Sequence, residues 1–199
     1  MNCLRRKRTV LLKGIDEIDK KILRSLSENP ELSQVELSDK LKISQPAVSA
    51  RLHKLKETGV LAYSVGTDIK KSQLFLAKMD IVTTGTEDVI SFFEKCPLYL
   101  NSFLTSGKYN LTVFLVGENM RSIMSCVDSH MRNDPLIKDM EFNLIVTPIR
   151  DFIVPIRPIL EKKKTIPCET EIDCSNCALY TNNRCLGCPA SVHYKGSLL

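Results

Sequence analysis

The 199-residue sequence predicts an α+β protein built from three kinds of segment. Three helical periods with capping residues and short turns fill residues 15–61. Strand-like and helix-like segments then alternate, and a cysteine-rich stretch follows them. The predicted division is a basic arm at 1–14, a helical domain at 15–64, a linker at 65–72, a mixed domain at 73–156 and a cysteine-rich extension at 157–199.

The helical domain opens with an apolar stripe whose spacings of three and four suit one buried helix face. Its members are Ile15, Ile18, Ile22 and Leu26, and Asn29 with Pro30 ends the helix. Ser33 and Glu36 form a capping box that starts a second helix. Ser44 caps a third helix, which Gly59 ends. The short turn between the second and third helices predicts a helix-turn-helix.

The third helix would bury Val48, Leu52 and Leu55, which directs its polar side chains outward or sideways. These side chains are Gln45, Ser49, Arg51, His53, Lys54 and Lys56. Residues 40–56 hold five lysines and arginines and no acid, a bias that phosphate neutralisation explains. Amides and hydroxyls near a helix start, flanked by cations, suit the major groove of double-stranded DNA. The alternative is a three-helix bundle that only contacts proteins.

The pairing of IDEIDKKIL with LKISQPAVSARLHKLKETGVL resembles the leucine-responsive regulatory protein/AsnC (feast/famine) family of transcriptional regulators. The resemblance implies a winged helix-turn-helix head followed by a βαββαβ, ferredoxin-like domain for effector binding and oligomerisation. It also implies a homodimer or higher oligomer, which DNA geometry favours because paired recognition helices read a palindrome.

The later sequence fits the implied βαββαβ order. Strands are predicted at residues 73–82, 100–105, 111–116 and 140–146, with helices after Gly85 and after Asn119. The second of these helices would bury Met120, Ile123, Met124, Val127 and Met131.

A turn at residues 106–110 joins two of these strands, and its glycine lets a ligand approach the backbone. The resemblance places effector binding in this region, so we expect Gly107, Lys108, Tyr109 and Asn110 to take part. The family pattern usually ends in an acid where this chain has Asn110, and an amide brings no charge for an ammonium group. This difference disfavours a free amino acid as the effector. An ordinary hairpin turn is the alternative.

The extension carries the pattern C-x5-C-x2-C-x7-C-x2-C, formed by Cys168, Cys174, Cys177, Cys185 and Cys188. Two C-x2-C pairs can direct four thiolates at one metal centre, and disulfides are disfavoured inside cells. A [4Fe-4S] iron–sulfur cluster and zinc both remain open. Pro189 has no amide N–H to offer a sulfur, and with the fifth cysteine this favours the cluster. Unrelated thiols and a transient disulfide switch are the alternatives.

The formal charge of +5 resides in the basic arm, through Arg5, Arg6, Lys7, Arg8 and Lys13. Such an arm can lie along DNA or simply aid solubility. No apolar run approaches the roughly 18 residues of a membrane span, and no signal peptide is evident, so we expect a cytoplasmic protein.

Two other function classes compete with a regulator: an enzyme on a siroheme decarboxylase-like scaffold, and a metal-storage or metallochaperone module. The three histidines, His53, His130 and His193, offer few candidates for a haem pocket. The prediction is therefore a regulator and not an enzyme.

Overall fold

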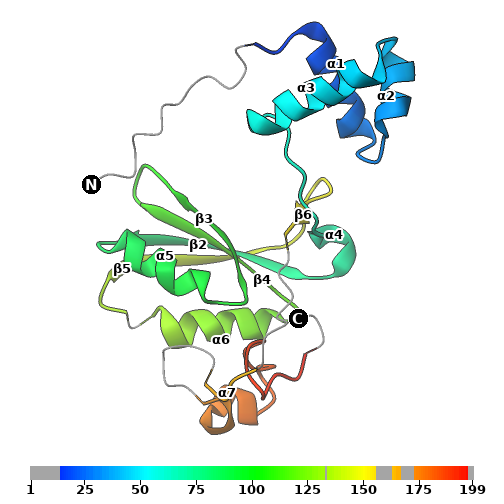
Figure 1. Cartoon of the computed structure of the whole chain (residues 1–199). Coiled ribbons are helices and arrows are strands. Elements are labelled where there is room, and N and C mark those ends of the chain that lie inside the picture. The colour runs from blue at the N-terminus through cyan, green and yellow to red at the C-terminus, as the bar shows by residue number, and fades with distance from the viewer. Residues whose placement is uncertain (1–13, 133, 156–162, 167–172, 197–199) are drawn as a thin grey trace. The chain divides into compact units, whose positions relative to one another are not determined.

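The computed structural model describes residues 14–132, 134–155, 163–166 and 173–196. The chain forms two compact units, Met1–Ser64 and Val65–Leu199 (Figure 1). The predicted basic arm, through Lys13, and Cys168 lie outside the described residues. Within those ranges, no helix combines the length and apolar character needed to cross a membrane.

The first unit contains the helices α1 (Glu17–Glu28), α2 (Gln34–Leu41) and α3 (Gln45–Glu57). Each begins one residue after the residue whose side chain caps it, and these caps are Asp16, Ser33 and Ser44. The capping box between Ser33 and Glu36 is present in both directions, at 2.7 and 3.2 Å. We call this unit the head.

The head has one small apolar core. Its buried members are Ile22, Leu26, Leu37, Val48, Leu52 and Leu55, drawn from all three helices. Lys42 adopts the left-handed conformation, with φ of 58°, at the end of α2, and this reverses the chain toward α3. The core therefore holds α3 by its apolar stripe, as its sequence period predicts.

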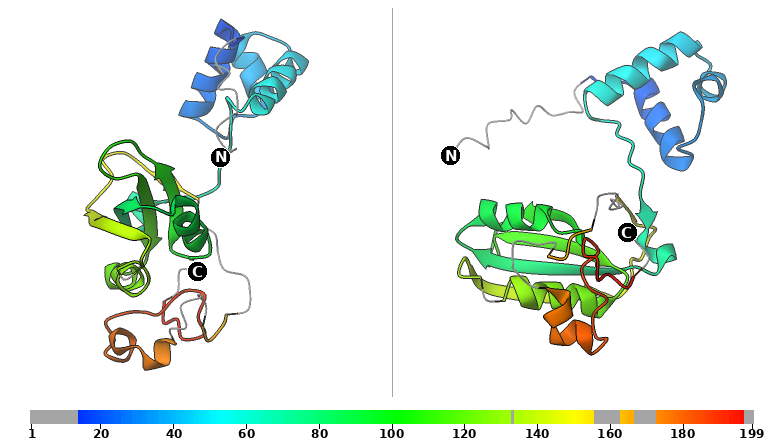
Figure 2. Two further views of the ribbon diagram at one scale, coloured as in Figure 1. Left: turned by 90° about the vertical axis from the view of Figure 1, so that its left-hand side faces the viewer. Right: turned by 60° about the horizontal axis from the view of Figure 1, so that its bottom comes forward.

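The second unit comprises residues 65–155, which we call the effector domain after its predicted role, and a tail whose described residues are 163–166 and 173–196. The effector domain has the element order β2 (Phe75–Thr83), α5 (Thr86–Glu94), β3 (Tyr99–Leu104), β4 (Leu111–Gly117), α6 (Met120–His130) and β5 (Ile137–Ile145). This order and the antiparallel sheet β3-β4-β2-β5 confirm the predicted fold class. Helices α5 and α6 cover one face of the sheet (Figures 1 and 2).

The main core lies between this sheet face and the two helices. Ala77, Met79 and Ile81 of β2 are fully buried there, because alternate residues of a strand share a face. Two details differ from the sequence prediction. Met124, predicted to be buried, is 42% exposed, and the strand predicted at 140–146 ends at Ile145, which leaves Val146 92% exposed. The α6 stripe is centred on Ile123 and Val127, and Met124 lies to its side.

Short elements close the ends of this unit. Strand β1 (Thr67–Asp68) pairs antiparallel with β6 (Ile153–Val154), and α4 (Ile69–Ser72) connects β1 to β2. A side chain at Gly66 would clash with the Val154 carbonyl, so this pairing requires a glycine. The predicted linker at 65–72 thus contains ordered structure.

The tail contains a 3-10 helix η1 (Cys174–Asn176) and a short helix α7 (Ala178–Thr181). An isolated bridge between Lys164 and Ser191 joins its two described segments. The tail lies along α6 (Figures 1 and 2).

Candidate DNA interface, effector turn and cysteine cavity

Helix α3 presents a polar face beside its buried stripe. Gln45, Ser49, His53 and Lys56 are exposed, while Val48, Leu52 and Leu55 are buried. His53 lies 3.4 Å from Glu57, and the Lys56 ammonium stands over the Tyr63 ring at 5.1 Å. Gln45 and Ser49 are in the first two turns of the helix, where a groove-binding helix meets base edges.

Arg51 and Lys54 of the same helix hold a buried carboxylate. The side chain of Asp19 on α1 is fully buried, and Arg51 Nη1 lies 2.7 Å from its Oδ1. Lys54 Nζ is 3.2 Å from the other carboxylate oxygen. Arg51 also reaches the cap residue Asp16, at 2.6 Å. These contacts tie α3 to the start of α1.

The electrostatics of this network favour the charged forms. Burial by itself raises the pKa of Asp19, but the hydrogen bonds from Arg51, the Asp16 amide and Lys54 outweigh it, so that the pKa lies below the ordinary value of 3.8. Hydrogen bonds to Asp16 and Asp19 raise the pKa of Arg51. Arg51 therefore has a structural role in the head. That Arg51 and Lys54 contact DNA stays a prediction.

The predicted effector turn uses its polar side chains within the protein. Asn110 donates from Nδ2 to the Thr83 carbonyl at 2.7 Å and accepts from the Thr83 amide at 2.9 Å. These two hydrogen bonds join the residue just before β4 to the end of β2. The Asn110 amide N–H also donates to the Ile81 carbonyl at 3.0 Å, so this residue holds the two strands together where their pairing ends.

The two residues before Asn110 contact β5. Lys108 lies 2.9 Å from Asp139, which raises the lysine pKa, and Tyr109 donates to Glu141 at 3.0 Å. Gly107 has a φ of 122°, a conformation that favours glycine. Effector binding at this turn stays a prediction, while its structural role is clear.

A cavity of about 70 Å³ lies between the segment that follows α5, helix α6 and the tail. It is lined by Cys96, Leu98, Ser122, Ser125, Cys126, Ser129, His130, Cys174, Cys177, Tyr180, Cys185, Gly187 and Cys188. The tail therefore brings both of its C-x2-C pairs to one place. Within the described ranges, however, no three Cys, His, Asp or Glu side chains are arranged to hold a metal ion.

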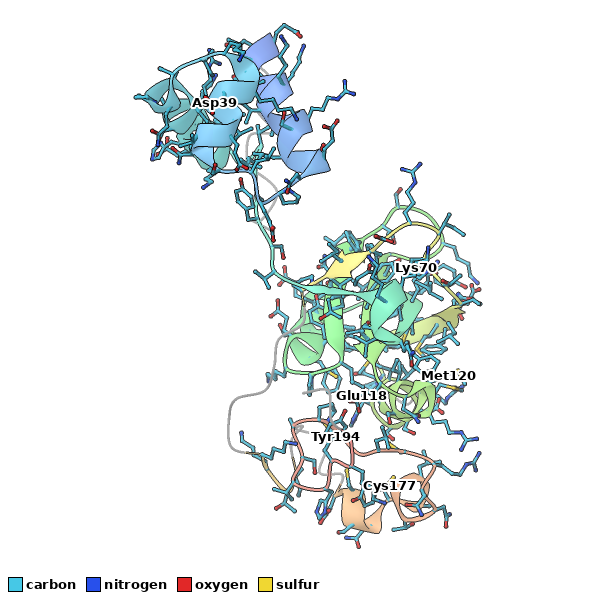
Figure 3. All side chains as sticks on the ribbon, turned by 90° about the vertical axis from the view of Figure 1, so that its right-hand side faces the viewer. Asp39, Lys70, Glu118, Met120, Cys177 and Tyr194 are labelled. Carbon is cyan, nitrogen blue, oxygen red and sulfur yellow. The ribbon has the colours of Figure 1, made fainter. Side chains whose placement is uncertain are left out.

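Two hydrogen bonds anchor the tail, one to α6 and one to Glu118, which lies just before that helix. The Leu186 amide donates to the buried Ser122 hydroxyl at 3.1 Å, and Tyr194 donates to Glu118 at 2.8 Å. Figure 3 shows Tyr194 next to Glu118, with Cys177 farther along the tail. Burial, then the Glu118 hydrogen bond, raises the pKa of Tyr194. The Gly187 amide also donates to Cys185 Sγ at 3.3 Å, an N–H···S bond supplied from within the C-x2-C pair.

Two isolated cysteines, whose proximity the sequence does not indicate, also line this cavity. Cys96 follows α5 and Cys126 lies on α6, and their sulfur atoms are 3.7 Å apart in the wall of this cavity. The spacing Cys126-x3-His130 is readable on one helix face, but the approach of Cys96 depends on how α5 packs against α6.

Known proteins share sequence and structure with this chain. A family model described as "Winged helix-turn-helix DNA-binding" matches residues 15–62. The HTH-type transcriptional regulator PF0864 of Pyrococcus furiosus is 32% identical over 153 residues, which cover 75% of this chain and 90% of that protein. Its solved structure, described as a member of the AsnC family, superposes with a TM-score of 0.56, 21% identity, and coverage of 67% of this chain and 90% of that one.

The chain belongs to the Lrp/AsnC family. It is a DNA-binding transcriptional regulator. The structure of Escherichia coli AsnC shares the fold, with a TM-score of 0.61 at 15% identity, covering 68% of this chain and 95% of that one. NMB0573 of Neisseria meningitidis, solved as a complex with L-Met, has a TM-score of 0.60 at 23% identity, covering 68% and 92%.

Proposed function

We propose that this Lrp/AsnC regulator recognises specific DNA sequences through the start of α3, as a cytoplasmic homodimer or higher oligomer. The observation that carries the proposal is the exposure of Gln45 and Ser49 at the start of a helix whose opposite stripe is buried. Their amide and hydroxyl groups can read base edges, while Lys56 and His53 face the sugar-phosphate backbone.

Assembly is supported by the apolar surface of the effector domain. Phe103 and Leu104, at the end of β3, are 51% and 66% exposed, which favours burial against another copy. A small-molecule effector is part of the proposal, because NMB0573, which shares this fold, was solved with L-Met. The Asn110 side chain is hydrogen-bonded to Thr83 and carries no charge for the ammonium group of an amino acid. The proposed effector is therefore a small molecule other than a free amino acid.

We also propose that the tail holds a metal centre that modulates the regulator. Cys174, Cys177, Cys185 and Cys188 line one cavity, which supports a four-thiolate site once the loops draw together around a cation. Cys168 is a substitute ligand. The fifth cysteine favours a [4Fe-4S] cluster. The N–H···S bond from Gly187 resembles those in zinc knuckles, so zinc remains the alternative.

The DNA proposal is tested by selecting bound sequences from a random duplex pool with the wild-type protein. Gln45→Ala and Ser49→Ala should change the selected sequence. Lys56→Ala should weaken binding to all sequences and lower the slope of log affinity against log salt by about one unit. Arg51 is unsuitable for this test, because its loss would disturb the head itself.

If all three variants lost DNA affinity equally for every sequence while keeping their helix content, sequence recognition by α3 would be contradicted. The relatives that match are transcriptional regulators, which supports this function over an enzyme on the same scaffold.

The metal proposal is tested on protein purified without oxygen, by measuring iron, sulfide and zinc per chain. Iron with sulfide is expected, together with the broad visible absorption of a cluster. One zinc in colourless protein would replace the cluster with a zinc site. Unchanged metal content after Cys177→Ser with Cys185→Ser would reject both.

A further inference from the structure

Cys96 and Cys126 lie together on the effector domain, beside the docked tail. Their sulfur atoms are 3.7 Å apart, and both side chains line the cavity. We propose that this pair is a redox-active site, at which hydrogen peroxide converts the two thiols to a reversible disulfide. The proposal goes beyond DNA recognition and requires no metal in the tail.

The local geometry allows the bond to form with a short movement. A disulfide needs a sulfur–sulfur distance of about 2.05 Å, so the two atoms must approach from contact distance. Cys126 is fixed on α6, next to the buried Val127. Cys96 follows the C-cap residue Lys95 and is outside the helix, where its side chain can rotate toward Cys126 while its backbone keeps its hydrogen bonds to Phe93 and Tyr99.

The cavity supplies access and a proton acceptor. Its volume of about 70 Å³ has room for about two molecules of the size of water, which admits peroxide. His130, four residues after Cys126 on α6, also lines the cavity. Its Nδ1 is buried and has no hydrogen-bond partner among the residues that the structure describes. Thiols that are reduced in the cell and oxidised transiently are the usual redox sensors there.

The reaction takes two steps and needs no oxidant other than peroxide. In the first step, one cysteine sulfur attacks a peroxide oxygen and the O–O bond breaks, which leaves a sulfenic acid. The released hydroxide takes the thiol proton, directly or through His130, and becomes water. In the second step, the other sulfur attacks the sulfenic sulfur, so that the S–S bond forms as the S–O bond breaks, and the hydroxide leaves as water with the second thiol proton. Two thiols and one peroxide give one disulfide and two waters.

The product would cross-link the end of α5 to α6, the helix that anchors the tail through Ser122. It closes a loop of about 30 residues, which restricts the unfolded chain. A rise of several degrees in the melting temperature of the effector domain is therefore expected on oxidation.

The test uses the full chain, treated with increasing peroxide, blocked with N-ethylmaleimide and digested with trypsin. Cleavage after Lys95, Lys108, Arg121 and Arg132 places the two cysteines in separate peptides, residues 96–108 and 122–132, with one cysteine each. We expect these peptides to be recovered joined, two hydrogens lighter than their sum, and to separate after dithiothreitol. The result should be the same before and after chelator treatment.

A single variant provides the control. In Cys126→Ser the joined peptide should be lost, and Cys96 should become trappable as a sulfenic acid by dimedone. The decisive measurement is made on the wild-type chain, so a variant that folds poorly does not affect it. The proposal would be overturned if Cys96 and Cys126 were both recovered as maleimide adducts while the tail cysteines oxidised. It would also be overturned if Cys96 and Cys126 were each joined to a tail cysteine and not to one another.

Discussion

At the scale of single residues, the fully buried Asp19 side chain fixes the position of α1 against α3. It faces two cations of α3, and its own helix start is capped by Asp16, which shares Arg51. An apolar helical period identifies which face is buried, but it does not say which of the remaining polar residues turn sideways toward a neighbouring helix. For this reason the sequence predicted Arg51 and Lys54 among the DNA contacts without indicating their partner.

This network predicts a defined pH dependence of head stability. Because the pKa of Asp19 is lower in the folded state, its charge stabilises the head fully above the unfolded value of 3.8 and loses this effect as the pH falls through the folded value. Asp19→Asn should lower the free energy of local unfolding by about 2 kcal/mol at pH 7, the value of hydrogen bonds to a charged group. The difference from wild type should shrink below pH 3.8.

Amide hydrogen exchange of α1 and α3, corrected for intrinsic rates at each pH, measures this free energy. Lys20→Ala, which removes an exposed ion pair with Glu17, is the matched control and should change it little. A constant difference between Asp19→Asn and wild type down to pH 3 would contradict the role given to Asp19.

Asn110 leads to a second prediction at this scale. An aspartate there could accept from the Thr83 amide but could not donate to the Thr83 carbonyl, and its charge would face that carbonyl oxygen. Asn110→Asp should therefore destabilise the effector domain by about 1–3 kcal/mol. Urea unfolding followed by circular dichroism measures the loss, and Ser106→Asp in the same turn is the control. Unchanged stability with new amino-acid binding in calorimetry would show instead that the position is a ligand site.

At the scale of elements, local sequence signals were enough to predict most of the helices and strands. Caps and apolar periods lie within one segment, so Ser33, Ser44 and Asn119 marked helix starts that the structure contains. The pairing of β1 with β6 was not predicted, because strands of two residues separated by some 85 residues leave no local pattern. Docking of the tail was missed for the same reason. It depends on Ser122 and Glu118, whose partners are far away in the sequence.

The tail contacts are testable one bond at a time. Tyr194→Phe keeps the ring but removes the hydroxyl that donates to Glu118, leaving the carboxylate without that partner. Hydrogen exchange in residues 185–195 should become faster, while the β2 and β4 amides keep their protection. Tyr180→Phe, on the same segment, is the control. Equal protection of the tail in Tyr194→Phe and wild type would mean that Ser122 and the cavity contacts suffice.

At the scale of the whole molecule, a head, an effector domain and a tail have different sources of stability. The head and the effector domain each have a buried apolar cluster, and the described tail residues contribute to neither. The cysteine spacing predicted a metal site but could not say that Cys96 and Cys126 would face the same cavity, which requires the packing of α5, α6 and tail together. A segment of this kind needs a cross-link or a cation to hold one conformation.

Loss of the proposed metal should therefore unfold the tail and leave the other two parts intact. After removal of metal by a chelator without oxygen, hydrogen exchange should rise across residues 173–196, while the cores around Ile22 and Met79 stay protected. If the tail communicates with the regulator through its anchors on α6, affinity for the selected DNA should change in the same titration. Cys177→Ser with Cys185→Ser should reproduce the chelated state in both measurements. A tail that stays protected in metal-free protein would show that the contacts with Ser122 and Glu118 hold it without a cation, and would leave the cysteines to redox chemistry alone.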